Sequence, residues 1–209
     1  MTERLHHGVI AYATSPRPPD WLHDINWKAY LDRYNLRESG SPFFVNETRI
    51  IDHVAGSVIE KALSFPENTG KKGVVLAIGH RGDLYIPPVA VKYGEINASD
   101  PEFINKLNKY TYYALFKSHF LIQHTELFAS QQNLKLPEGE VWKIDNNNLP
   151  GGAIAFKNGV VLGVSGLATG EQDSALVLAI GVKAHLVRPQ VAAGMAKDIG
   201  FAREYQKFI

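Results

Sequence analysis

The pattern of apolar and polar residues predicts an amphipathic helix over residues 50 to 65. Apolar side chains recur there at the spacing of about 3.6 residues that gathers them on one side of an α-helix. Asn46 or Thr48 suits the cap of the first turn, because each side chain carries an oxygen that accepts a backbone N–H. The opposite side of the helix is polar and carries His53. The predicted core stripe comprises Ile50, Ile51, Val54, Ala55, Val58, Ile59, Ala62 and Leu63.

Short apolar runs separated by turn residues predict two β-hairpins. In the first, His80-Arg81-Gly82-Asp83 connects the two runs. Pro87-Pro88 places the second run at a sheet edge or ends it, because proline cannot donate a ladder hydrogen bond. In the second hairpin, Asn158-Gly159 favours a type I′ turn, because both residue types tolerate positive φ. The predicted strands are residues 73 to 79, 84 to 90, 152 to 157 and 160 to 165, with a further strand at 8 to 12 or 140 to 144.

A second long helix is predicted over residues 103 to 123, with Ser99 or Asp100 as its cap and Pro101 in its first turn. This helix has two apolar sides, whereas a single core requires only one. Because a contiguous exposed aromatic patch is unfavourable in water, we expect another subunit, the N-terminal segment or a flat ligand to cover the second side. The first side comprises Phe103, Ile104, Leu107, Thr111, Ala114, Leu115, Leu121 and Ile122, and the second comprises Tyr112, Tyr113, Phe116, His119 and Phe120.

Glycines and a capping signal mark the region before the next predicted helix. Thr169-Gly-Glu-Gln172 fits a capping box, in which the Thr169 hydroxyl accepts the Gln172 amide N–H and the Gln172 side chain bonds back to Thr169. Gly151 and Gly152, which precede the second hairpin, allow the backbone to approach other backbone or a ligand closely.

Together these signals resemble the GlcG/HbpS-like proteins, a family that includes the haem-binding C-terminal domain of the PduO cobalamin adenosyltransferases. The resemblance rests on Gly151-Gly152 before a short strand, Val164-Ser165-Gly166 at the end of the next strand, and Gln172-Asp173 at the start of a helix. The upstream order of helix, strand, turn, strand and helix also matches, so the similarity covers residues 46 to 186. It implies an α/β, profilin-like fold, with a central antiparallel sheet of about five strands flanked by helices. It also implies an intracellular homo-oligomer that binds haem or a related planar ligand.

Composition narrows the class of protein. The 209 residues suit one domain, with an aromatic-rich N-terminal extension (1 to 45) before a GlcG/HbpS-like domain that ends in a C-terminal helical extension (46 to 209). The aromatic content of the extension argues against disorder and predicts packing on this or a neighbouring subunit. The lack of cysteine excludes disulfides, thiolate metal sites and cysteine nucleophiles, and no histidine pair has the helical spacing of a zinc site.

Charge and hydropathy exclude two kinds of partner. A net charge of +1 with interspersed signs gives no nucleic-acid-binding patch. No apolar run has the length of a secretory signal or a membrane span. We therefore expect a cytoplasmic protein without nucleic-acid or membrane partners.

Four residues with titratable or cationic side chains are candidates for ligand contacts. His119, among aromatic residues, is the first candidate for haem iron ligation, or else a histidine hydrogen-bonded in a subunit interface. His53 is either a second ligand or a solvated histidine. On one turn, Arg81 would hold an anion while His80 moves protons, or the turn is polar for solubility alone. His124 lies about 140° from His119 on an ideal helix, so the two cannot chelate one metal. The predicted ligand-binding residues are His53, His80, Arg81, Tyr112, Tyr113, Phe116, His119, Gly151 and Gly152.

Three functions stay open at the level of sequence. The first is binding of haem or another planar small molecule. The second is a small-molecule enzyme, of lyase or isomerase type, in which His80, Arg81 and the aromatic side of the second long helix hold an aromatic or carboxylated metabolite. The third is a non-catalytic assembly or partner-binding module that uses the same aromatic side and the N-terminal extension for contacts.

Overall fold

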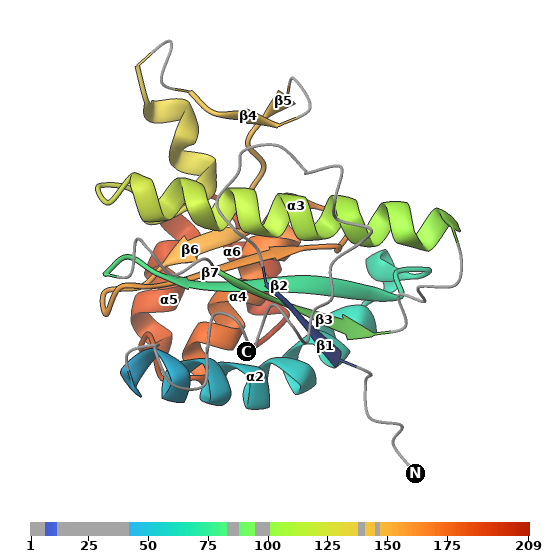
Figure 1. Cartoon of the computed structure of the whole chain (residues 1–209). Coiled ribbons are helices and arrows are strands. Elements are labelled where there is room, and N and C mark those ends of the chain that lie inside the picture. Colours follow the sequence, from blue (N-terminus) through green and yellow to red (C-terminus); the bar gives the residue numbers. More distant parts are fainter. Residues whose placement is uncertain (1–6, 12–41, 83–87, 95–100, 138–140, 145–146) are drawn as a thin grey trace.

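The computed structural model describes residues 7–11, 42–82, 88–94, 101–137, 141–144 and 147–209 (Figure 1). The helices are α2 (Pro42–Leu63), α3 (Pro101–Gln123), α4 (Gly170–Lys183), α5 (Pro189–Asp198) and α6 (Ala202–Gln206), with short 3-10 turns at Pro66–Asn68 (η2) and Ser130–Lys135 (η3). The strands are β1 (His7–Ala11), β2 (Gly73–His80), β3 (Val89–Gly94), β4 (Lys143–Ile144), β5 (Asn147–Asn148), β6 (Ala153–Ala155) and β7 (Val160–Ser165).

The main sheet is antiparallel and joins two pairs of strands, β2 with β3 and β6 with β7. Strands β3, β2, β7 and β6 are neighbours in that order, because β2 pairs with β3 on one side and with β7 on the other. Strand β1 pairs antiparallel with the outer side of β3, whereas β4 pairs with β5 in a separate two-stranded sheet. The predicted mixed α/β class with a central antiparallel sheet and flanking helices is therefore confirmed.

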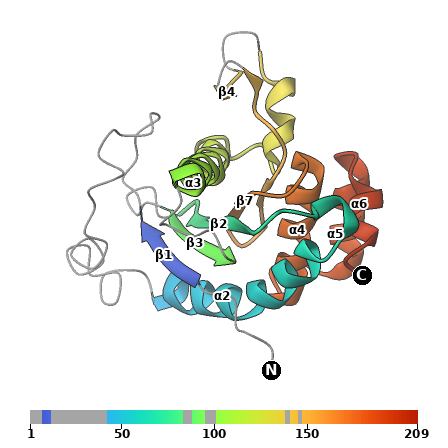
Figure 2. The same cartoon turned by 90° about the vertical axis from the view of Figure 1, so that its right-hand side faces the viewer.

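Helices cover both faces of the main sheet (Figures 1 and 2). Helix α3 packs on β2, β7 and β6 from one side, and α2 and α4 pack from the other, with α5 and α6 against α4. Alternation along β2 separates the two interiors, because successive side chains of a strand point to opposite faces. Val74, Leu76 and Ile78 enter the core beneath α2 and α4, whereas Val75 and Ala77 face α3.

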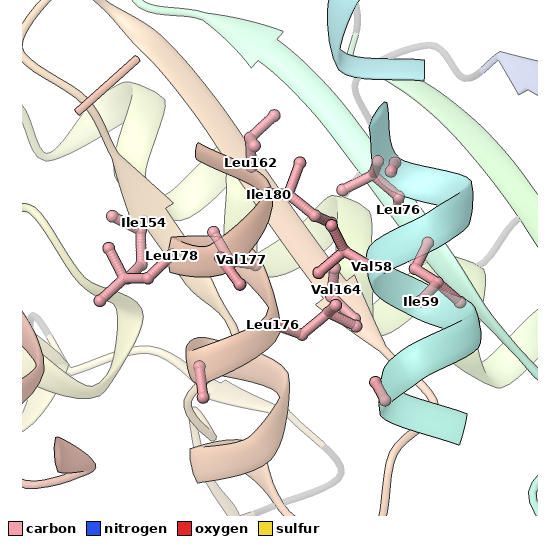
Figure 3. Close-up of a cluster of buried hydrophobic side chains, with 14 of the residues drawn as sticks. Val58, Ile59, Leu76, Ile154, Leu162, Val164, Leu176, Val177, Leu178 and Ile180 are labelled. Atoms are coloured by element: carbon pink, nitrogen blue, oxygen red, sulfur yellow. The ribbon is translucent and has the colours of Figure 1, made fainter. Parts of the chain in front are cut away.

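The core between the sheet and α2 and α4, which we call the aliphatic core, is built mainly from branched apolar side chains (Figure 3). Val58 and Ile59 of α2 meet Leu76 of β2 there, and Leu176 and Ile180 of α4 pack beside them. Helix α4 is buried from Gln172 to Gly181 because other helices pack on the side that faces away from the sheet. Each fully buried Leu or Ile contributes about 1.5–3 kcal/mol relative to exposure, so this layer is a main source of stability.

The second hairpin forms as predicted, but its turn is not type I′. Gly159 has φ +92°, whereas the described non-glycine residues include only His185 with positive φ, so Asn158 does not adopt the conformation that type I′ requires. The Gly159 N–H donates to the Phe156 carbonyl at 2.9 Å, and the Phe156 N–H donates to the Val160 carbonyl at 2.8 Å. This is a longer loop in which a single glycine takes the left-handed position.

Several predicted boundaries move in the structure. Helix α2 begins at Pro42, before the expected caps Asn46 and Thr48, and Ile50 is 49% exposed although it was assigned to the core stripe. Strand β3 starts at Val89, and residues 84–87 of the predicted strand lie outside the described residues. So do the predicted caps at 99–100 and most of the N-terminal extension. Proline in the first helical turn explains the early start of α2, because its φ is already helical.

The predicted cap of α4 is confirmed in one of its two bonds. The Gln172 N–H donates to the Thr169 hydroxyl at 3.2 Å. The Gln172 side-chain oxygen accepts the N–H of Ala168 at 3.3 Å, and not that of Thr169.

Within the described residues, no helix combines the length and apolar character needed to cross a bilayer.

Candidate functional site

One side of α3 carries a contiguous set of partly exposed rings, which we call the aromatic face: Tyr112, Tyr113, Phe116 and His119. The ring centroids of Tyr112 and Phe116 lie 5.5 Å apart, and those of Tyr112 and Tyr113 lie 6.0 Å apart. These separations are typical of favourable aromatic pairs. The structure therefore brings together four of the residues that the sequence predicted for ligand contact.

Trp142 lies against the aromatic face and was not predicted from the sequence. Its ring centroid is 5.1 Å from that of Phe116 and 6.0 Å from that of His119. The buried Asn133 fixes the Trp142 backbone, because its amide donates to the Trp142 carbonyl at 2.8 Å and its oxygen accepts the Trp142 N–H at 2.7 Å. The indole is thus a fixed wall of the aromatic face.

Phe120 was assigned to the exposed aromatic side, and this assignment is wrong. The residue is 0% exposed and belongs to a second apolar core between α3 and the sheet, where Trp142 packs on it at 5.4 Å. The sheet core and Trp142 therefore cover part of the side for which the sequence predicted another subunit, the N-terminal segment or a flat ligand as the cover.

His119 is held in one tautomer by its neighbour on α3. Its Nε2 lies 2.8 Å from the side-chain nitrogen of Gln123, which can only donate a hydrogen bond. Nε2 must therefore accept, and the ring proton resides on Nδ1. Partial burial lowers the pKa of His119, because desolvation disfavours the imidazolium. Burial thus favours the neutral imidazole, and its Nε2 contacts the side chain of the exposed Gln123.

His124 also contacts Trp142, with a centroid separation of 5.8 Å. The expected separation of about 140° between His119 and His124 assumes a continuous helix. Helix α3 ends at Gln123, although the His124 N–H still donates to the Phe120 carbonyl at 2.9 Å, and the His124 ring packs on Phe120 at 4.6 Å. The two imidazoles consequently lie against the same indole, although the sequence separated them.

Arg81 donates its hydrogen bonds to the end of α3. Its Nε donates to the Leu121 carbonyl at 2.9 Å, and its Nη2 donates to the carbonyls of His124 and Leu127, the first at 3.1 Å. Carbonyls at the end of a helix lack intrahelical partners, and the guanidinium supplies donors to them. Burial lowers the Arg81 pKa. These contacts stabilise the end of α3. They also occupy donors of the Arg81 guanidinium, which the sequence predicted would hold an anion.

His80 is engaged in the two turns at the same end of the sheet. Its Nδ1 accepts the Gly82 N–H at 2.9 Å, and its Nε2 lies 3.0 Å from the Asn158 carbonyl oxygen. The neutral Nε2–H tautomer satisfies both bonds, so the imidazole links the first turn to the second hairpin.

His53 is exposed on α2, which covers the opposite face of the sheet from α3. The structure thus separates His53 from the aromatic face.

The glycine pair borders a buried lysine that the sequence analysis missed. Lys117 of α3 is 0% exposed, and its Nζ donates to the Gly151 carbonyl at 3.0 Å and to the Val164 carbonyl at 2.5 Å. Nζ also lies 3.5 Å from Oδ2 of Asp173, at the start of α4. A Cβ on Gly152, whose φ is +115°, would lie 2.5 Å from this nitrogen. The glycine pair therefore leaves room for an ammonium group that connects α3 to α4.

Burial disfavours both charges of the Lys117–Asp173 pair. It raises the pKa of Asp173 to about 6, against the opposing influence of Lys117, and it lowers the pKa of Lys117. The remaining carboxylate oxygen of Asp173 accepts the Leu167 N–H at 3.1 Å. Three acceptors around Nζ satisfy the ammonium, so the arrangement is suited to holding two helices together. The sequence feature that could have indicated this ion pair is a lysine within the buried stripe of α3.

The chain was compared with known proteins at three levels. No protein-family model, no curated protein and no solved structure matched it. The resemblance to the GlcG/HbpS-like family therefore stays a prediction, and the function is argued from the aromatic face and its histidine.

Proposed function

We propose that this protein binds a planar, conjugated small molecule on the aromatic face of α3, with haem as the candidate cofactor. The observation that carries the proposal is His119, a half-buried imidazole with a lowered pKa, whose ring lies 6.0 Å from that of Trp142 and whose Nε2 contacts the exposed amide of Gln123. The lone pair of a neutral imidazole either coordinates iron or accepts a hydrogen bond from a ligand.

The neighbouring side chains suit a flat ligand. Tyr112, Phe116 and Trp142 offer ring surfaces, and each aromatic contact contributes about 0.5–1.5 kcal/mol beyond the area it buries. Lys109 lies with its Nζ 5.3 Å from the centre of the Tyr113 ring, where a carboxylate at the edge of a ligand would meet a cation. If haem binds here, His119 would hold the iron and Lys109 would lie near the propionates. Bound iron would supply redox or oxygen chemistry at that position.

The finer architecture implied by the resemblance belongs to the same proposal: a five-stranded, profilin-like sheet, a homo-oligomer and a cytoplasmic location. The antiparallel pairing of β1 with β3 supports the first. The partly exposed rings of the aromatic face support the second, since a neighbouring subunit would cover those that a ligand leaves in contact with water.

A titration with haemin tests the proposal. We expect a Soret shift that saturates at one haemin per chain, and an affinity at least tenfold lower for His119→Ala. The exposed His53→Ala is the matched control and should bind like wild type. Gln123→Ala removes the amide that covers Nε2 and should bind equally well or more tightly. Equal affinity of wild type and His119→Ala would overturn the role of this histidine.

A second titration uses metal-free protoporphyrin and follows quenching of tryptophan fluorescence. If the aromatic face binds the ring and His119 binds the iron, protoporphyrin should bind wild type and His119→Ala alike. No binding of either probe would leave the aromatic face as an assembly surface. The enzymatic alternative has less support, because the Arg81 guanidinium, its proposed anion clamp, donates to three carbonyls.

A further inference from the structure

The turn of the second hairpin carries a chemically reactive pair, Asn158-Gly159. Among the 209 residues of the sequence, this is the only asparagine that glycine follows. The Asn158 side chain is exposed to water. Glycine has no Cβ, so its backbone nitrogen is the least hindered of any residue. The pair therefore places a cleavable side-chain amide next to an accessible nitrogen nucleophile.

The structure orients the Asn158 side chain over the backbone that follows it. Its Oδ1 accepts the Val160 N–H at 3.4 Å, as in an Asx-turn, in which the side chain folds back on the next two residues. This contact keeps the side-chain carbon Cγ on the same side of the chain as the Gly159 nitrogen. Groups held close to one another react faster, because the entropy of approach has already been lost.

His80, on the neighbouring strand β2, contacts the peptide between the two residues. Its Nε2–H donates to the Asn158 carbonyl at 3.0 Å, and a Cβ on Gly159 would lie 2.7 Å from this nitrogen. The Gly82 N–H donates to the other ring nitrogen at 2.9 Å and fixes the ring. A hydrogen bond to a carbonyl draws electron density from the amide nitrogen, since linked polar groups polarise one another. The Gly159 N–H thereby becomes more acidic.

One contact opposes attack by the Gly159 nitrogen. The Gly159 N–H donates to the Phe156 carbonyl at 2.9 Å, and this bond must open before the nitrogen is deprotonated. Hydrogen bonds in exposed turns open locally, at a lower free energy than global unfolding requires. The reaction therefore proceeds through local opening of the turn while the rest of the sheet stays folded.

We propose that Asn158 is a site of spontaneous deamidation, assisted by His80. The Gly159 nitrogen gives its proton to water or hydroxide and forms a bond to Cγ of Asn158. The Cγ–Nδ2 bond breaks, and ammonia leaves with a proton returned by water, so that a cyclic succinimide remains. Water then adds to either carbonyl of the ring and opens it. The product is aspartate or isoaspartate, and no oxidant, reductant or cofactor takes part.

Deamidation changes the turn in two ways. It adds a carboxylate beside His80, and isoaspartate also adds a methylene to the main chain. The bonds that close the turn, between Gly159 and Phe156 and between Phe156 and Val160, then no longer match its length. We expect the deamidated fraction, separated by anion exchange, to melt at a lower temperature than fresh protein. The site is independent of the aromatic face, so either proposal can fail without the other.

Incubation of the purified protein at pH 6 and pH 8, followed by peptide mapping with mass spectrometry, tests the site. Asn158 should convert to aspartate and isoaspartate, faster at pH 8 because the deprotonated nitrogen is the nucleophile. Asn158→Gln is the matched control, since it keeps the amide but must close a larger ring, and it should convert more slowly. The buried Asn68 and Asn133 should stay unchanged in the same digest.

Two substitutions of His80 test its assistance. His80→Asn keeps an acceptor for the Gly82 N–H but is too short to donate to the Asn158 carbonyl, so conversion should slow by roughly twofold to tenfold, the equivalent of one hydrogen bond. His80→Gln has an amide long enough to donate and should restore the rate. Thermal melting checks that both variants are folded.

The outcomes separate the site from its assistance. A rate in His80→Asn that equals or exceeds that of wild type would overturn the role of His80. Conversion of Asn158 no faster than that of Asn68 and Asn133, or no faster than that of the glutamine in Asn158→Gln, would overturn the site itself.

Discussion

The two faces of the main sheet are packed by different means. Beneath α2 and α4, the sheet presents branched residues such as Leu76 and Leu162 to an apolar core. Towards the middle of α3 it presents small residues such as Ala77, and a Cβ on Gly163 would lie 2.6 Å from the Ala114 carbonyl oxygen. Small side chains let the helix backbone come close to the strands. One face thus gains stability from buried area, and the other depends on close approach.

Close approach brings buried polar groups with it. On α3, Thr111 and Ser118 are buried with their hydroxyls donating to carbonyls one turn earlier, at 2.7 and 2.9 Å. Lys117 is buried between them, with its ammonium among carbonyl oxygens and Asp173. A buried polar group is tolerated only while it is hydrogen-bonded. Substitutions on the α3 side should therefore lower the stability of the fold by removing hydrogen-bond partners, and not only by reducing the buried area.

The largest effect is expected for Lys117→Met. The change keeps an apolar stem but removes the ammonium, which leaves Asp173 and two carbonyls buried without their partner. Breaking a buried ion pair from one side costs about 3–5 kcal/mol. Urea unfolding, followed by far-UV circular dichroism at pH 7, measures the loss.

The double variant Lys117→Met/Asp173→Leu is the control for this interpretation. Replacing both partners by apolar residues removes the unpaired charge, so the double variant should be more stable than Lys117→Met alone. If the two variants unfold at the same urea concentration, Asp173 does not depend on Lys117 and the pair does not hold α3 to α4.

On the other face, Leu162→Ala should cost about 2–5 kcal/mol, because the aliphatic core cannot collapse fully around the lost side chain. Leu162 is 0% exposed and lies among the side chains of β7, β2 and α4. The same urea measurement applies, and this loss should be independent of pH between 4 and 7, since no titratable group is removed. A loss of stability below about 1 kcal/mol would contradict the inference that this face is stabilised mainly by buried apolar area.

Asp173 should give the α3 side a pH dependence that the aliphatic core lacks. Burial raises its pKa from 3.8 to about 6, so between these values the folded chain holds a proton that the unfolded chain releases. The stability that Asp173 contributes is therefore present below about pH 4 and is lost as the pH rises to about 6. The free energy of unfolding of wild type minus that of Asp173→Asn should fall across this window. A difference that grows with pH would mean that attraction to Lys117 outweighs desolvation.

Gly163→Ala tests the close approach itself. Its Cβ would meet the Ala114 carbonyl and the Ser118 hydroxyl, so α3 must shift, at a cost of about 1–3 kcal/mol. Gly194 in α5 is the matched control, because nothing lies within 4 Å of its added Cβ. Gly194→Ala should stabilise the protein by about 0.4–1 kcal/mol, since alanine favours helix and restricts the unfolded chain. Equal effects of the two substitutions in thermal melts would argue against tight packing at Gly163.

The sequence was sufficient for those parts of the fold that depend on local periodicity. Periodic patterns predicted the second hairpin and the helices α2, α3 and α4, and Thr169 was recognised as a cap from its spacing to Gln172. The second strand of the first hairpin was placed too early, because β3 begins at Val89 and not at residue 84. The early start of α2 at Pro42 was missed, because the aromatic residues that follow it gave no cap signal. The turn at Gly159 was assigned the wrong type, because Asn-Gly suits several hairpin loops and the tertiary contacts decide among them.

For the candidate site, the sequence predicted what lies on one helix and missed what other segments bring to it. Tyr112, Phe116 and His119 share a side of α3, so their proximity follows from helical spacing. Trp142 comes from another segment, where Asn133 holds its backbone by two hydrogen bonds, and no periodic pattern reveals this contact. Lys117 could have been identified from its place in the core stripe, although its pairing with a residue of another helix could not.

The smallest effect is expected for Lys207→Gln, which removes an ion pair outside both cores. Lys207 contacts Glu67 and Glu204, the latter at 2.6 Å, but its side chain is 33% exposed. Water and salt therefore screen the attraction. The hydrogen bond from Lys207 lowers the pKa of Glu67 below 4.5. The stability that Glu67 contributes is therefore present above pH 4.5 and is lost as the pH falls through the lowered pKa. This pH dependence is opposite in sign to that of Asp173. We expect a loss well below that of Lys117→Met at pH 7, which shrinks in 1 M salt and at pH 3. A loss that persists in both conditions would mean that the Lys207 stem, and not its charge, packs against the C-terminal helices.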